Sequence, residues 1–272
     1  MTILHALLLG IIQGLTEFLP VSSSGHLVLA QNLLGVDKAL LDKAIVFDLT
    51  LHMGTVVAVF YCYWTDVKNI LHDIFRRNHT VENQGGLKNH NLSLMFLISI
   101  IGTAIIALPF EKFIKDAFEN AVYAAIGLVI TSIILFASIF TKGNLQISGM
   151  NGMKAFLIGL AQGVASMPGI SRSGCTIVSG MALGFVPKEA ARYSFLLSIP
   201  TIILASMVQA LDAVKEGSLN VPAIHYVIGF AASMIFGIIS IKALIRFLES
   251  THIAWFGAYC LPIGIITYFL VR

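Results

Sequence analysis

Two short polar stretches, each inside a long apolar region, decide the fold of this chain: LPVSSSGH at residues 19–26 and MPGISRSG at residues 167–174. The first interrupts the apolar region 1–34, and the second interrupts the region 153–184. Each half of an interrupted region is too short to cross a bilayer, because a spanning helix needs about 20 apolar residues. Irregular backbone at membrane depth survives only where protein or a wet cavity satisfies its polar groups. Both regions are therefore predicted to be re-entrant helical hairpins.

The composition places the rest of the chain in the bilayer as well. Of the 272 residues, 57% are hydrophobic and 11% are charged, whereas a soluble domain carries about 25% charged residues. Six further stretches are long and apolar enough to span, namely 44–64, 92–111, 118–140, 190–212, 222–248 and 253–271. The polar segment 66–91 is predicted to be a solvated loop. The expected fold is an all-α integral membrane protein with six transmembrane helices and two re-entrant hairpins.

The charge content argues against a nucleic-acid partner, and the cysteine content argues against a metal site or disulfide framework built from cysteines. The net charge is only +3 and no basic cluster occurs, so nucleic acid is not an expected partner. The three cysteines, Cys62, Cys175 and Cys260, lie far apart in or beside apolar stretches. Their spacing fits neither a metal site nor a disulfide framework. They are expected to pack as small hydrophobic side chains.

The two interrupted regions are copies of one another. A shift of 149 residues aligns them without a gap. The matched pairs include Gln13 with Gln162, Gly14 with Gly163, Ser22 with Ser171, Ser24 with Ser173 and Gly25 with Gly174. Three predicted spans separate the copies, and an odd number of crossings inverts the second copy relative to the first. The chain is therefore predicted to be one membrane domain, 1–272, with inverted halves 1–142 and 149–272 and a ligand site where the broken elements meet.

Basic residues outside the spans predict the orientation. Ten of them fall on the side of the 66–91 segment and six on the opposite side. Because positively charged loops stay in the cytoplasm, the side with ten is predicted to be cytoplasmic. Both termini would then face outward.

Two charged residues lie inside the interrupted regions, Glu17 and Arg172. Ionisable residues at that depth cost about 2.5–3.5 kcal/mol on insertion scales and usually mark function. A structural ion pair between the halves is the competing explanation, but a dense hydroxyl cluster surrounds the charges and favours function. The hydroxyls can donate hydrogen bonds, and the glycines let backbone N–H groups approach a ligand closely. Together with a helix N-terminus, which favours anions, they suit a phosphate. The predicted phosphate-binding residues are Ser22, Ser24, Gly25, Gly169, Ser171, Ser173 and Gly174, with the fork of Arg172 beside them.

The carboxylate of Glu17 would repel a bare phosphate, so it needs a separate role. It acts either as a general base or as a ligand of a divalent metal. Gln13 lies one helical turn earlier on the same face, and two oxygens at that spacing suit Mg²⁺ or Ca²⁺. His26 is a candidate base or nucleophile close to Ser23. Asp48 and His52 share a helix face and either line the cavity or bond to another helix.

At these residues the chain resembles the undecaprenyl-diphosphate phosphatase family associated with bacitracin resistance. The segments that carry the resemblance are QGLTEFLPVSSSGH at 13–26, PGISRSG at 168–174 and FLLSIP at 195–200. Chain length and span count agree as well. The resemblance implies that Glu17, Ser23, His26 and Arg172 form the essential group. Gln13 replaces the commoner Glu, which puts a charged metal ligand at that position in doubt.

The resemblance further implies hydrolysis of undecaprenyl diphosphate to undecaprenyl phosphate and inorganic phosphate, with a divalent metal. It implies a site that opens to the outer face of the bacterial plasma membrane. Ser23 or His26 is predicted to attack phosphorus first. Ser23 is favoured because it aligns with Arg172 in the repeat, where its neighbours align with serines, and its hydroxyl would point towards a phosphate bound by that cation. Direct attack by water competes. A polyprenyl-phosphate flippase or transporter is the alternative function. Expected partners are the lipid substrate and membrane lipids, with a homodimer left open.

Overall fold

The computed structural model describes residues 1–35, 45–76, 92–118, 120–216 and 222–271, and their regular structure is helical apart from one isolated bridge between Leu145 and Phe185. This agrees with the predicted all-α class. The helices are α1 (Ile3–Phe18), α2 (Ser23–Leu33), α4 (Ile45–Cys62), α5 (Trp64–Arg76), α6 (Leu92–Ala107), α7 (Glu111–Phe118), α8 (Ala121–Ala137), α9 (Gly152–Val164), α10 (Arg172–Ala182), α11 (Pro187–Glu216), α12 (Ala223–Ser250) and α13 (Trp255–Val271).

Both polar stretches break a helix where the sequence predicts it. Helix α1 ends before Leu19, which is extended because a proline follows it. Helix α2 then begins behind the N-cap Ser22, whose hydroxyl accepts a hydrogen bond from the backbone N–H of Gly25. In the second copy, Ser171 caps α10 and accepts from the N–H of Gly174. Helices α2 and α10 are both 11 residues long, and their bounds differ by the same 149 residues as the sequence copies.

The copies also pack in equivalent ways. Helix α1 of the first half lies along α12, and α9 of the second half lies along α6. Small residues allow the close approach: a side chain at Gly14 would meet the backbone of Ser233 and Gly237, and one at Gly163 would meet Thr103 and Ile106. Small residues at helix interfaces are common where lipid offers no hydrophobic drive for association.

Three helical segments of the described residues are long and apolar enough to cross a bilayer, and up to five are if each of two bent pairs counts as one span. The three are Ala121–Phe140, Pro187–Leu211 and Ala223–Ser250. The bent pairs turn by 87° between Val46–Cys62 and Trp64–His72, and by 76° between Leu92–Ala107 and Glu111–Phe118. The sixth predicted span, 253–271, forms the 17-residue helix α13, about 26 Å long at 1.5 Å per residue. The chain is a multi-pass membrane protein.

One predicted loop is wrong over the part that the structure describes. The segment expected to be a loop from Asp66 onward continues as helix α5 to Arg76, and residues 77–91 lie outside the described ranges. The helix is stable because it is amphipathic: Val67 packs into the core, while Asp66 pairs with Arg192 of α11. The overall polarity of the segment concealed this periodicity.

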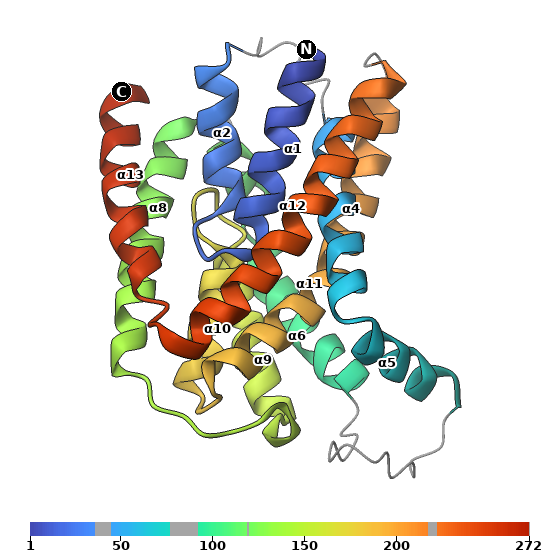
Figure 1. The fold of residues 1–272 in the computed structure, drawn as a ribbon, viewed down its shortest axis with the longest axis vertical. Helices are drawn as coiled ribbons and strands as arrows, with labels where there is room; N and C mark the ends of the chain where they lie inside the picture. Colours follow the sequence, from blue (N-terminus) through green and yellow to red (C-terminus); the bar gives the residue numbers. More distant parts are fainter. Residues whose placement is uncertain (36–44, 77–91, 119, 217–221, 272) are drawn as a thin grey trace.

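The arrangement brings the two polar loops together in the interior of the molecule. Figure 1 shows the loop between α1 and α2 beside the loop between α9 and α10, near mid-height, with α2 and α10 leading away in opposite directions. The N-terminal ends of both helices therefore face the same central region. The two chain termini lie at one end of the molecule.

Candidate active site

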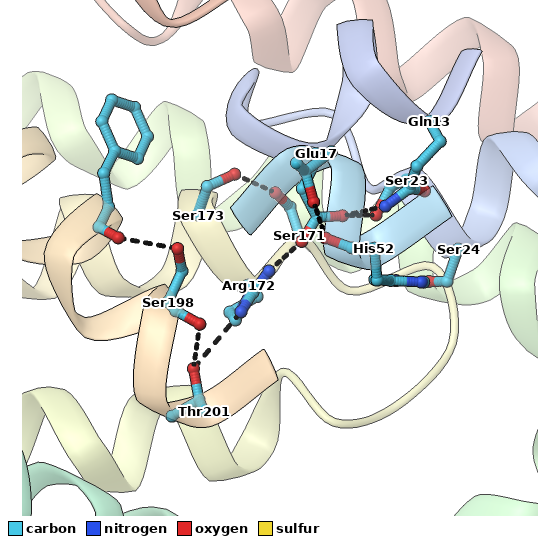
Figure 2. A network of polar contacts seen from close by, with 12 residues as sticks. Gln13, Glu17, Ser23, Ser24, His52, Ser171, Arg172, Ser173, Ser198 and Thr201 are labelled. Carbon is cyan, nitrogen blue, oxygen red and sulfur yellow. Dashed lines mark hydrogen bonds and ion pairs between the residues drawn. The ribbon is translucent and has the colours of Figure 1, made fainter. Parts of the chain in front are cut away.

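Glu17 is the centre of the polar network between the two loops. It is the penultimate residue of α1 and is 5% exposed. One carboxylate oxygen, Oε2, accepts hydrogen bonds from the Ser23 hydroxyl at 2.6 Å and from Gln13 Nε2 at 2.9 Å. The other oxygen, Oε1, pairs with the guanidinium of Arg172 (Figure 2). A buried charge needs such partners, because an unpaired one costs several kcal/mol or more.

Arg172 connects the second polar loop to the first. It is the first residue of α10, and its Nη2 binds Glu17 of α1. Its Nη1 donates to the Thr201 hydroxyl at 3.4 Å, and that hydroxyl donates in turn to the carbonyl of Leu197 at 2.9 Å. The side chain is 23% exposed, so part of the guanidinium remains available to a ligand. Thr201 was missed by the sequence reasoning; its signal was its position directly after the FLLSIP segment.

The four repeat-equivalent serines form two matching pairs. The hydroxyls of Ser22 and Ser24 lie 3.2 Å apart, as do those of Ser171 and Ser173. Each pair also contacts the other loop. Ser24 accepts from the backbone N–H of Gly169 at 3.3 Å, and Ser173 donates to the carbonyl of Leu19 at 3.1 Å.

The predicted glycines bring the loops into close contact. Gly169 has a φ of +80°, and a Cβ there would overlap the carbonyl oxygen of Ala124. A Cβ on Gly25 would lie 3.4 Å from the Cα of Gly169. A Cβ on Gly174 would lie 3.1 Å from the Ser171 hydroxyl that caps its own helix. These glycines shape the walls of the site and do not themselves face the cavity.

A cavity of about 270 Å³ lies against this network. Of the predicted site residues it is lined by Glu17, Ser22, Ser23, Ser24, Ser171 and Arg172. Gln13, Gly25, His26, Gly169, Ser173 and Gly174 are not among the residues that line it. The polar lining residues that the site prediction did not include are His52, Thr103, Gln162, Ser166, Thr201, Ser206 and Gln209. The apolar lining residues, which we call the apolar wall, are Leu49, Phe118, Ala165, Met167, Ile170, Ile202 and Ala205.

His26 is turned away from the cavity. Its Nδ1 lies 2.8 Å from the carbonyl oxygen of Ser22, and its Nε2 lies 2.9 Å from the hydroxyl of Tyr259 on α13. The two rings are stacked, with centroids 5.7 Å apart and an interplanar angle of 9°. Both ring nitrogens therefore already have partners.

Another imidazole lines the cavity. His52 of α4 lines the cavity, and Figure 2 shows it near Glu17 and Ser23. Its Nδ1 lies 2.8 Å from the carbonyl oxygen of Asp48. The carboxylate of Asp48 is not among the lining groups, and its Oδ1 is buried without a hydrogen-bond partner among the described residues. The sequence left open whether Asp48 and His52 line the cavity or bond to another helix. His52 lines the cavity, and Asp48 does not.

The residues around Glu17 supply a limited set of cation ligands. No group of three or more His, Cys, Asp or Glu that could hold a metal ion occurs in the described part of the chain. Gln13 Oε1, however, is buried beside Glu17 and has no hydrogen-bond partner among the described residues. Mg²⁺ is usually held by one or two carboxylates together with phosphate oxygens and water. Gln13 and Glu17 fit such a cation, provided that phosphate oxygens and water supply most of the cation's ligands.

Known proteins match this chain along nearly its whole length. The family model for "Bacitracin resistance protein BacA" matches residues 6–266. The chain is 38% identical to the "Undecaprenyl-diphosphatase" of Methanosphaera stadtmanae, over 98% of each chain. It is also 38% identical to the protein of the same name from Halothermothrix orenii, over 98% of this chain and 97% of the relative. With its interrupted helices and its buried Glu-Ser-Arg network, the chain belongs to the family of the bacitracin resistance protein BacA.

Proposed function

We propose that this protein hydrolyses undecaprenyl diphosphate to undecaprenyl phosphate and inorganic phosphate, which returns the lipid carrier to cell-wall synthesis. The observation that carries the proposal is the juxtaposition of Ser23, Glu17 and Arg172 at one cavity: a hydroxyl bonded to a carboxylate, beside a cation. A nucleophile next to a base and an anion clamp is what phosphoryl transfer requires. The names of the curated relatives supply the substrate class.

The mixed lining of the cavity suits a lipid diphosphate. Arg172 and the N-terminal ends of α2 and α10 attract phosphate oxygens, because the N-terminus of a helix carries partial positive charge. The apolar wall, which includes Leu49, Phe118 and Ile202, receives the first isoprene units. A small soluble phosphate ester has no use for that wall.

Ser23 is the nucleophile in this proposal. Its hydroxyl already donates to Glu17 Oε2 at 2.6 Å, so the carboxylate is placed to take the proton. Phosphate oxygens that draw Arg172 away from Glu17 leave the carboxylate able to accept it. The Ser23 oxygen bonds to the terminal phosphorus, and the bond from that phosphorus to the bridging oxygen breaks. Undecaprenyl phosphate leaves with the electron pair, and water then cleaves the phosphoserine to release inorganic phosphate.

A divalent cation is part of the proposal, and Glu17 and Gln13 would be the residues that hold it. It would supply positive charge to offset the charge on the two phosphates. The protein's own residues provide the remaining steps: Glu17 accepts the proton, and Arg172 orients the terminal phosphate.

The finer membrane topology also belongs to the proposal. We place six crossings and two re-entrant hairpins in a bacterial plasma membrane, with the cavity opening outward. The lengths of α2, α9 and α10, which are 11, 13 and 11 residues, support hairpins, since each falls well below the about 20 residues that a span needs. The common end of the two termini supports one side for both, and the bias of basic residues favours that side being external.

The test is phosphate release by purified protein in detergent from undecaprenyl diphosphate, with and without a chelator. Acid-quenched samples digested for mass spectrometry then identify the covalent intermediate. Phosphate on a Ser23 peptide supports the serine mechanism, and phosphohistidine at His26 favours the imidazole. Single-step inversion at phosphorus, measured with a chiral thiophosphate substrate, excludes any covalent intermediate. A protein that releases no phosphate with or without Mg²⁺ or Ca²⁺ refutes the function.

A further inference from the structure

We infer that His26 is a positioning residue that, with Tyr259, braces the strained loop from which Ser23 projects. The inference rests on the proposed function and assigns a role to a tyrosine in the opposite half of the chain. In this inference His26 does not act as base or nucleophile on the phosphate. It acts on the reaction indirectly, by holding the backbone of Ser22.

The hydrogen bonds determine the tautomer of His26. The carbonyl oxygen of Ser22 can only accept, so the ring nitrogen 2.8 Å from it, Nδ1, must carry the proton. In the neutral ring Nε2 then has a lone pair, and it accepts from the Tyr259 hydroxyl at 2.9 Å. Both nitrogens are used in this way, and the ring is not among the groups that line the cavity. The geometry therefore gives His26 a structural partner on each side and no free nitrogen for the substrate.

The loop that His26 contacts needs support. Ser22 has a φ of +69°, and it is the only residue other than glycine with positive φ among the described residues. Side chains are unfavourable in that region, and such residues persist only where the surroundings hold them. The Ser22 carbonyl receives both the backbone N–H of His26, at 3.2 Å, and its ring N–H. Ser23 follows directly, so the orientation of this peptide sets where the Ser23 hydroxyl points.

Helix α13 holds the brace from outside the loop. Tyr259 stacks on the His26 ring with an interplanar angle of 9° and donates its hydroxyl to it. The neighbouring Cys260 thiol lies 3.8 Å from the carbonyl oxygen of Pro20 in the same loop. Two consecutive residues of α13 thus contact both ends of the loop. A displaced α13 would release the Ser22 conformation and move the Ser23 hydroxyl away from Glu17.

The decisive experiment is a double-mutant cycle on phosphate release. Tyr259→Phe keeps the stacked ring and removes one neutral hydrogen bond, so kcat should fall by about 3- to 10-fold while KM stays within about twofold. Ser22→Gly removes the strain, because glycine adopts positive φ freely. In the Ser22→Gly background, Tyr259→Phe should therefore have little further effect on kcat. Tyr123→Phe, on α8 and outside the site, is the matched control and should leave kcat unchanged.

Two results would overturn the brace. One is an equal fold-loss from Tyr259→Phe in both backgrounds; the other is wild-type kcat in Tyr259→Phe. A readout independent of turnover is nitrogen NMR of ¹⁵N-histidine protein, with the His26 signal assigned by its loss in His26→Gln. It should show the neutral Nδ1–H tautomer and a shifted Nε2 in Tyr259→Phe; an Nε2–H tautomer contradicts the inference. Wild-type protein that releases no phosphate refutes the proposed function, while the NMR result still decides the brace.

Discussion

Replacing Arg172 by lysine tests how the site recognises a diphosphate. The guanidinium uses separate nitrogens for Glu17 of α1 and Thr201 of α11. A lysine ammonium is a single point of charge, so it cannot keep both partners or grip two phosphate oxygens in parallel. The loss of one hydrogen bond to a charged group costs about 1.5–3 kcal/mol, which corresponds to about a 10- to 150-fold fall in kcat/KM.

The assay is phosphate release from undecaprenyl diphosphate over a range of substrate concentrations, for Arg172→Lys and wild type. Arg192→Lys is a close control, because the Arg192 side chain has the same exposure of 23% and also pairs with a carboxylate, Asp66, but does not line the cavity. It should retain kcat/KM. If Arg172→Lys stays within about threefold of wild type, a plain positive charge is enough and the argument from the planar fork fails.

Three further predictions concern other parts of the site and its topology. Glu17→Gln should abolish turnover and weaken the response to Mg²⁺ or Ca²⁺ in titrations, since the amide can neither take the Ser23 proton nor hold a cation strongly; an unchanged rate and metal dependence would make Glu17 structural. Gly169→Ala should lower the thermal unfolding temperature in detergent, because alanine at φ +80° is strained by about 1–2 kcal/mol and its Cβ overlaps Ala124; Gly149→Ala, where a Cβ has ordinary contacts, is the control. In a cysteine-free background, a cysteine at position 272 should react with an impermeant reagent added outside intact cells and one at position 80 should not; the reverse pattern would invert the orientation.

Sequence alone determined the features that depend on residues close together in the chain. Low charge content requires a bilayer, whatever the tertiary arrangement. Pro20 and the serines behind it end one helix and cap the next, because backbone restriction and capping act within a few residues. The 149-residue shift of the copied motif recurs in the bounds of helices α2 and α10 for the same reason. The prediction of an anion site came from residue types that have few other uses at membrane depth.

The wrong loop prediction had one local cause and one long-range cause. The segment after Asp66 was predicted to be a loop from its polarity, yet it forms α5 because one face of the helix is apolar and Arg192 neutralises Asp66. The ion pair lies between residues 126 positions apart, so the spacing of the sequence carries no sign of it.

Only the tertiary structure decided which side chains face the cavity. His26 lies within the decisive motif, yet its ring points to Tyr259, 233 residues away, while His52 from an outlying pair lines the cavity. Arg172 meets Glu17 across 155 residues and Thr201 across 29. The direction of these side chains depends on how α1, α10, α11 and α13 pack against one another. The backbone preferences of the two polar loops would be satisfied equally well with the side chains pointing in other directions. Helix breaks and caps are set by short-range backbone energetics, but the partners of a buried carboxylate are set by whichever helices lie against it.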